Sequence, residues 1–125
     1  MRRTVLSLHE FSLASFGGKR GVRDANLLDS ALARAKNLRV YGSEPTPHRL
    51  AVAIGYGICK NHPFIDGNKR TAFISAAVFL EMNGFRANAP EVDVVHTMNA
   101  LAAGTMSEEE FAAWLEQTFP PKRKR

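Results

Sequence analysis

The stretch that decides the fold is His62-Pro63-Phe64-Ile65-Asp66-Gly67-Asn68-Lys69-Arg70, together with the ten uncharged residues that follow it, 71–80. Those ten residues are apolar nearly all round, which predicts a helix from about Asn68 to Asn83 that is the most buried element of the chain, with Gly84 as its stop. The polar residues before them therefore lie on the loop and first turn that lead into this helix. A helix N-terminus offers unpaired N–H groups and the positive end of a dipole, which together favour an anion.

The residue types at this helix start fit a phosphate. Gly67 lets the backbone turn sharply and approach a ligand closely. Asn68, Lys69 and Arg70 would surround a phosphate with side-chain donors in addition to backbone ones. The two cations would also balance charge on a phosphoryl group during its transfer. The cluster thus predicts ATP or phosphate binding by Gly67, Asn68, Lys69 and Arg70.

Two further residues supply the chemistry of transfer. His62 can accept a proton near neutral pH, as a hydroxyl nucleophile requires. Asp66 is a hard oxygen ligand of the kind that Mg²⁺ takes, with substrate phosphates in its other positions. No Ser or Cys is placed as a covalent nucleophile, so direct transfer to an external acceptor is the simpler interpretation. The alternative is that His62, Asp66 and Asn68 only cap the helix, but all three beside two cations favour a functional site.

The rest of the chain predicts an all-α fold in one domain, residues 1–119. Helix signals recur along it: a Ser7–Glu10 capping box with a stop at Gly17-Gly18, a cap at Asp24, a start at Thr46-Pro47, an opening at Pro90 and a second capping box at Ser107–Glu110. Gly55 and Gly57 within the third helix predict close packing against another helix. The segment 37–44 contains Leu38, Arg39, Val40 and Tyr41, which alternate apolar and polar residues, and it is predicted to be either an extended flap or a plain connecting loop.

Composition limits the classes of function. The formal charge is +5, but the four cations of residues 122–125 supply most of it and leave +1 for the rest. Residues 120–125 are therefore predicted to be a disordered basic tail, and no direct nucleic-acid partner is expected. Cys59 is the single cysteine, and we expect it to be buried and inert. No apolar run approaches the ~20 residues of a membrane span, so we expect no membrane partner and a cytoplasmic protein.

The stretch 62–70 resembles the signature of Fic-domain proteins, in the variant found in Doc toxins. The segments 21–32 and 79–84 also resemble the corresponding parts of that family, so the resemblance covers nearly all of residues 1–119. It implies a helical bundle around a buried central helix. Most Fic enzymes have Gly where this chain has Lys69 and a second Arg where it has Phe73, and they transfer AMP. Doc proteins share the Lys, which implies transfer of the ATP γ-phosphate instead.

The resemblance also implies partners. It implies a protein kinase with catalytic residues His62, Asp66, Lys69 and Arg70, and a threonine of elongation factor Tu as the target. It implies silencing by a cognate antitoxin whose tail folds into a groove beside the site. In Fic proteins a flap holds the target chain by strand pairing, and residues 38–41 are the candidate for that role here. The alternatives are a Fic-type AMP transferase and a catalytically silent module that binds an antitoxin.

Overall fold

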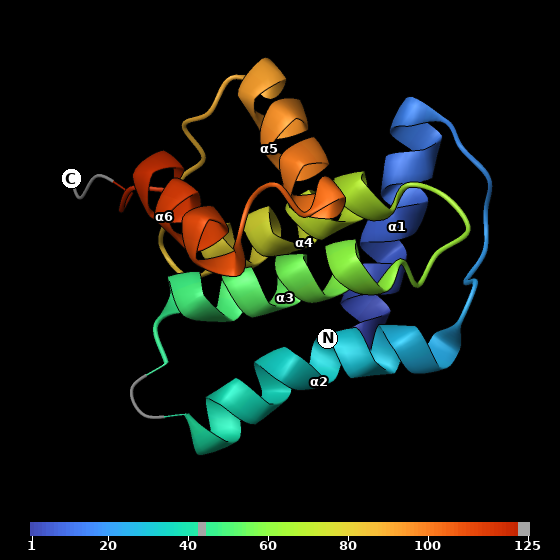
Figure 1. Ribbon diagram of the computed structural model, residues 1–125, viewed down its shortest axis with the longest axis horizontal. Helices are drawn as coiled ribbons and strands as arrows, with labels where there is room; N and C mark the ends of the chain where they lie inside the picture. Colours follow the sequence, from blue (N-terminus) through green and yellow to red (C-terminus); the bar gives the residue numbers. More distant parts are fainter. Residues whose placement is uncertain (43–44, 123–125) are drawn as a thin grey trace.

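The computed structural model describes residues 1–42 and 45–122, and within them the chain forms six helices and no strand (Figure 1). The helices are α1 (Arg2–Phe16), α2 (Ala25–Tyr41), α3 (Pro47–Asn61), α4 (Asn68–Met82), α5 (Glu91–Ala103) and α6 (Glu108–Thr118). The prediction of an all-α bundle is confirmed. We find no helix among these residues that is both long and apolar enough to cross a membrane.

Two neighbouring helices, α3 and α4, run antiparallel and form the centre of the bundle (Figure 1). We expected α4 to be the most buried helix, but α3 buries more of its residues. The reason is that Phe73 and Ile74 of α4 are only half-buried, because both line a surface groove, although Phe73 also packs against the core. α3 is enclosed instead, with α2 against one side and α4 against the other.

The glycines of α3 explain how it fits between its neighbours. A Cβ atom added to Gly57 would lie 2.8 Å from the carbonyl oxygen of Ala31 in α2. One added to Gly55 would lie 3.2 Å from the ring of Phe111 in α6. Real Cβ atoms rarely come so close, so the prediction of close helix packing at both glycines is confirmed. Cys59, also in α3, is fully buried as expected, and burial raises the pKa of its thiol.

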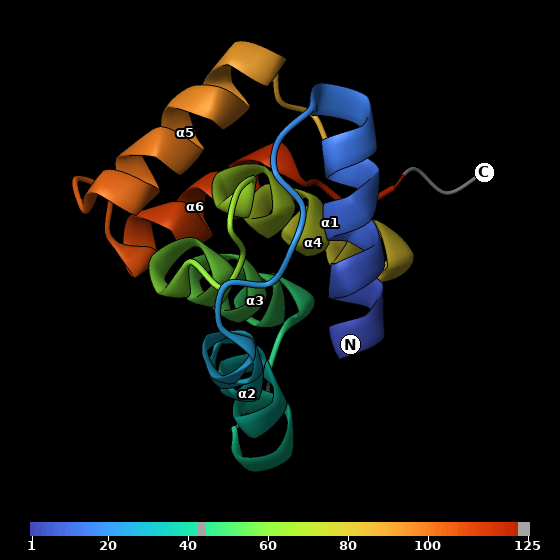
Figure 2. The ribbon, with the colours of Figure 1, turned by 90° about the vertical axis from the view of Figure 1, so that its right-hand side faces the viewer.

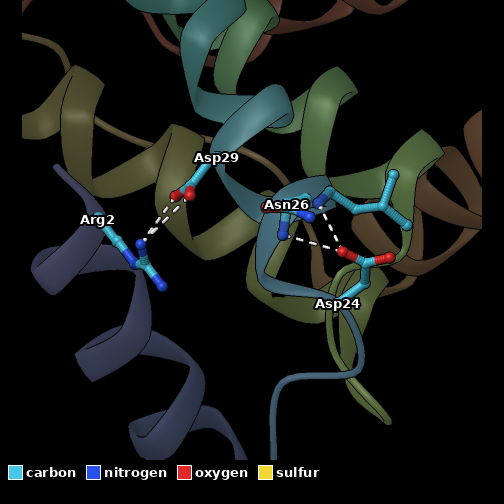
Figure 3. Close-up of polar contacts among 5 residues, drawn as sticks. Arg2, Asp24, Asn26 and Asp29 are labelled. Carbon is cyan, nitrogen blue, oxygen red and sulfur yellow. Dashed lines mark hydrogen bonds and ion pairs between the residues drawn. The ribbon is translucent and has the colours of Figure 1, made fainter.

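The start of α2 shows how these helices are fixed at their ends (Figure 3). Asp24 Oδ1 accepts hydrogen bonds from the backbone N–H groups of Asn26 and Leu27, at 2.9 and 3.1 Å. This is the N-cap that the sequence predicted. One turn further along, Arg2 donates to the carboxylate of Asp29 at 3.0 Å and links α1 to α2.

Two further helices, α3 and α6, have a side-chain cap at their start, whereas α1, α4 and α5 have none. Thr46 caps α3, and Ser107 with Glu110 forms the predicted capping box on α6. The predicted box of Ser7 and Glu10 is wrong, because α1 begins well before Ser7. Neither Gly nor Pro precedes Ser7, so nothing in the chain stops the helix from extending upstream.

The segment Leu38–Tyr41 is not an extended flap, and that prediction is wrong. It forms the last turns of α2, which Gly42 closes by donating its N–H to the carbonyl of Leu38 at 2.8 Å. The physical reason is that Leu38 continues the helical spacing of Ala31 and Ala35 and packs against the core. The neighbouring residues 43 and 44, which the expected flap also included, fall outside the described residues.

The first residues of the predicted tail, 120–122, pair with residues 84–86 through backbone hydrogen bonds. Arg86 N–H donates to the carbonyl of Pro120 at 3.0 Å, and Lys122 N–H donates to the carbonyl of Gly84 at 2.8 Å. Phe85 and Pro121 therefore form an isolated β-bridge. The prediction of disorder from residue 120 is wrong for residues 120–122, because this short antiparallel contact satisfies their backbone groups. Residues 123–125 of the predicted tail lie outside the described part of the chain.

Candidate active site

His62 lies at the point where α3 ends and the polar loop begins. Its backbone is left-handed, with φ 50° and ψ 56°, and it is the one non-glycine residue with positive φ among residues 1–42 and 45–122. Its N–H still donates to the carbonyl of Ile58 at 3.1 Å, so the residue closes the helix. Such backbones are uncommon outside glycine and often occur at functional sites. Its side chain is exposed.

The loop after His62 is held in shape by Asn68. The side chain of Asn68 is buried, accepts the N–H of Phe64 and donates to the carbonyl of Phe64, both at 2.9 Å. Phe64 and Pro63 are fully buried and anchor the loop to the core. Asn68 was predicted to hold a phosphate with its side chain, but the structure uses that amide to close the loop. Its backbone N–H is what remains for a ligand.

The carboxylate of Asp66 is held by backbone donors. Lys19 N–H donates to Oδ2 at 3.1 Å and Gly67 N–H donates to Oδ1 at 2.8 Å. These two hydrogen bonds, first that from Lys19 and then that from Gly67, lower the pKa of Asp66, so the group is ionised at neutral pH. Each oxygen accepts one bond and keeps a lone pair in an exposed position, which fits the single carboxylate that Mg²⁺ commonly takes beside phosphates. No cluster of three metal-ligating side chains occurs among the described residues.

The N-terminus of α4 is open. Gly67 is its N-cap, with a left-handed φ of 75°, and no side chain caps the helix. The first N–H with an acceptor is that of Thr71, which bonds Gly67 at 3.0 Å, so those of Asn68, Lys69 and Arg70 precede the hydrogen-bonded turns. The side chains of Lys69 and Arg70 are exposed at the same place. Free N–H groups and two cations at a helix start can together bind an anion.

A groove of about 570 Å³ leads from this helix end across the face of α4. Figure 2 shows α4 between α1 and α5. Residues of α5 line one side of the groove, and Phe16 at the end of α1 also contributes to it. The polar end holds His62, Asp66, Gly67, Asn68, Lys69 and Arg70, and the apolar part holds Phe16, Phe73, Ile74, Val94, Val95 and Met98. Arg70 lies over the ring of Phe16, 4.2 Å from its centre. All six residues that the sequence assigned to catalysis and phosphate binding therefore meet in one groove.

Sequence analysis missed His9 as part of this site. His9 is 2% exposed, and its Nε2 lies 2.8 Å from the carbonyl oxygen of Asp66. A carbonyl only accepts, so Nε2 carries the proton and donates. The ring also stacks on Phe64 with centroids 3.8 Å apart. The signal was present in helical spacing, because His9 lies four residues from the buried Val5 and Leu13 on either side.

The extended segment beside the site is also not the one that the sequence indicated. Ile65 N–H donates to the carbonyl of Gly21 at 3.1 Å, and Arg23 N–H donates to that of Pro63 at 2.7 Å. Val22 and Phe64 therefore form an antiparallel bridge. In this hydrogen-bond pattern the N–H and carbonyl of Val22 point away from Phe64, toward the exposed side. The segment Gly21–Arg23 thus offers a free backbone edge beside His62.

Comparison with known proteins adds to this geometry. A family model described as Fic/DOC family matches residues 2–80, a region that includes the whole polar stretch. A protein named Toxin Doc, from Mycolicibacterium smegmatis (strain ATCC 700084 / mc(2)155), is 44% identical over 72 residues, covering 56% of this chain. A protein named Protein kinase doc, from Escherichia phage P1, is 27% identical over 89 residues, covering 70% of this chain. The matched regions span 55% of the first relative and 71% of the second.

Proposed function

The chain belongs to the Fic/DOC family, and from this premise we propose that it is a toxin of a toxin–antitoxin module that phosphorylates a target protein. In this proposal the γ-phosphate of ATP passes to a hydroxyl group of the target. The family resemblance makes a threonine of elongation factor Tu the first target to test. Two relatives carry the names Toxin Doc and Protein kinase doc, and these names support both parts of the proposal.

The observation that carries the proposal is the open start of α4. Lys69 and Arg70 lie on its first turn, next to the positive end of the helix dipole, and no acidic residue occurs there. Two cations at this end are unfavourable unless an anion joins them. A polyphosphate would accept hydrogen bonds from the free N–H groups and neutralise both side chains.

The reaction proposed for this groove is a direct transfer of the γ-phosphoryl group from ATP to the target. The target hydroxyl oxygen forms a bond to the γ-phosphorus, the bond from that phosphorus to the bridging oxygen breaks, and ADP leaves. The exposed imidazole of His62 takes the hydroxyl proton. Lys69 and Arg70 stabilise the charge on the transferring group. Mg²⁺, when bound, would neutralise phosphate charge beside Asp66, which the lowered pKa keeps ionised.

Lys69 supports phosphoryl transfer over AMP transfer. Its side chain occupies the helix start that the family's AMP transferases leave clear with glycine, and Phe73 replaces their second arginine. Phe73 is half-buried on the groove floor and offers no donor for a terminal phosphate. The phosphates of a nucleotide would therefore bind Lys69 and Arg70 at the open end of the groove, and the groove beyond them is apolar.

Target binding is assigned to the segment Gly21–Arg23. Val22 is exposed, and its free N–H and carbonyl fit an added strand from the target. The role first assigned to residues 38–41 falls on helical backbone, whose N–H groups are used within α2 and cannot pair with an added strand. The apolar part of the groove, with Phe73, Ile74 and Val95, fits the apolar face of an antitoxin helix.

The test uses purified protein, Mg²⁺ and elongation factor Tu, with ATP labelled at either the γ- or the α-phosphate. We expect γ-label alone on the target, and its loss in the variant His62→Ala. Transfer of α-label would overturn the kinase proposal and make the protein an AMP transferase. If neither label is transferred while an antitoxin still binds, a labelling screen of a whole lysate separates a wrong target from a silent binding module.

A further inference from the structure

One residue outside the polar stretch, Arg23, contacts the backbone of His62 and of the residues on both sides of it. Arg23 donates from Nε to the carbonyl of His62 at 2.8 Å and from Nη2 to the carbonyl of Asn61 at 3.0 Å. Its own backbone N–H donates to the carbonyl of Pro63 at 2.7 Å. A single residue therefore binds three consecutive carbonyls, and His62 is the middle one.

These carbonyls need partners because α3 ends there. The last carbonyls of a helix have no acceptor role within it and carry the negative end of the dipole. A cation that also donates hydrogen bonds satisfies both conditions. The left-handed backbone of His62 turns its carbonyl out of the helix direction, toward the guanidinium of Arg23.

We infer that Arg23 is a positioning residue that holds the left-handed backbone of His62 and thereby aims its imidazole at the acceptor hydroxyl. The catalytic part of this inference rests on the proposed function, whereas the backbone part does not. The planar guanidinium presents Nε–H and one Nη2–H side by side, which matches two adjacent carbonyls. A lysine has one ammonium on a flexible stem and reproduces the charge without this fork.

The same segment provides a matched control. Arg20 lies three residues before Arg23 and is also exposed, but it forms a surface ion pair with Glu10 at 3.0 Å. It contacts none of the three carbonyls. If exposed arginines of this segment acted only through net charge, the variants Arg20→Ala and Arg23→Ala would behave alike.

The experiment compares Arg23→Ala, Arg23→Lys and Arg20→Ala with the parent protein by two readouts. The first is the NMR chemical shifts of the backbone at residues 61–63, which report the left-handed conformation without any substrate. The second is kcat and the KM for ATP in the γ-transfer assay. We expect Arg23→Ala to change the shifts and lower kcat about tenfold or more, because a misplaced base loses much of its contribution. We expect the KM for ATP to stay within about twofold, because the open N-terminus of α4 binds the phosphates independently of this residue.

Arg23→Lys should keep the fold and recover only part of kcat, and Arg20→Ala should match the parent in both readouts. Parent-like shifts and kcat in Arg23→Ala would overturn the inference, and so would a KM for ATP that rises as strongly as kcat falls, since Arg23 would then bind phosphate. If Arg23→Ala fails to fold, Arg23→Lys decides by the same two criteria. If the parent transfers no label, the proposed function fails, and the backbone shifts alone decide whether Arg23 holds His62.

Discussion

The starts of α6 and α4 are built in opposite ways. Ser107 accepts the N–H of Glu110 at 3.0 Å, and the Glu110 side chain accepts the N–H of Ser107 at 2.9 Å. The first turn of α6 also carries three glutamates, at 108–110. α4 has no side-chain cap, a left-handed Gly67 and two cations in its first turn. The start of α6 is capped by its own side chains and carries acids, whereas the first turn of α4 carries two cations and no acid of its own.

The difference between the two helix starts can be expressed as a free energy of unfolding. A side-chain cap contributes about 1 kcal/mol, and a well-placed charge at a helix end contributes about 0.3–1 kcal/mol. The start of α4 forgoes both, so an anion that binds there recovers stability for the whole protein. On the proposed function, α4 gives up local stability in order to bind an anion, and substitutions at either helix start test this.

The largest effect is expected when the charges of α4 are made to resemble those of α6. The double variant Lys69→Glu with Arg70→Glu should reduce γ-transfer by about 100-fold or more, because it places repulsion where phosphate charge develops. Without nucleotide the same variant should be more stable by about 0.5–1 kcal/mol, because acids suit this helix end. Label transfer and urea unfolding without ligand measure the two effects.

The control reverses the charge at the other helix. Glu109→Lys on α6 should lose a few tenths of a kcal/mol and leave transfer unchanged, since this residue makes no side-chain contact with the groove. A double variant of α4 that is less stable without nucleotide would contradict the comparison.

The second effect concerns the support beneath the site. His9→Phe keeps a ring to stack on Phe64 but removes the donor to the carbonyl of Asp66. A buried acceptor without its partner costs about 1–3 kcal/mol, so we expect the melting temperature to fall. We also expect transfer to weaken, because the carbonyl belongs to the loop that carries Asp66.

The variant His9→Gln separates the two contacts of His9, since it keeps a donor and loses the ring. If His9→Phe matched the parent in melting temperature and transfer, the hydrogen bond to Asp66 would have no role in shaping the loop.

Much of this site could be predicted because its parts are adjacent in the chain. Residues 62–70 bring their own loop, helix start and charges, so local sequence is enough to find them. His9 and Arg23 contribute from distant segments, and their partners are backbone carbonyls that every residue carries. No pattern of residue types marks such a contact, although helical spacing could have placed His9 on a buried face.

The fold shows the same limit. Two Ser-x-x-Glu patterns predicted two capping boxes, but only the one at Ser107 forms. Gly104, with a left-handed φ of 82°, ends α5 just before Ser107 and leaves it free to start a helix. Ser7 has no such stop before it. A Ser-x-x-Glu pattern therefore predicts a capping box only where the preceding residues end or prevent a helix.

A smaller effect is expected when the cap of α6 is removed. Ser107→Ala should lower the free energy of unfolding by about 1 kcal/mol, because the N–H of Glu110 loses its acceptor. Nucleotide affinity and γ-transfer should not change, since Ser107 lies outside the groove. Chemical unfolding and a nucleotide titration check both statements. A loss of affinity that equals the loss of stability would mean that the two helix starts are coupled.

The smallest effect is the pH dependence that comes from Asp66. Its pKa is lowered by the backbone donors Lys19 and Gly67, so the folded protein releases this proton more readily than the unfolded chain, whose value is about 3.9. The stabilisation is therefore fully present above that ordinary value and is lost as the pH falls through the lowered value of the folded state. The carboxylate is exposed, so water screens the effect and keeps it small. Urea unfolding of the parent and of Asp66→Asn, from about pH 7 down to about pH 2, should show a difference that shrinks only at the acid end. A stability difference between parent and variant that stays constant across this range would contradict this prediction. It would mean that the charge of Asp66 contributes nothing and that its hydrogen bonds act like the neutral cap of Ser107.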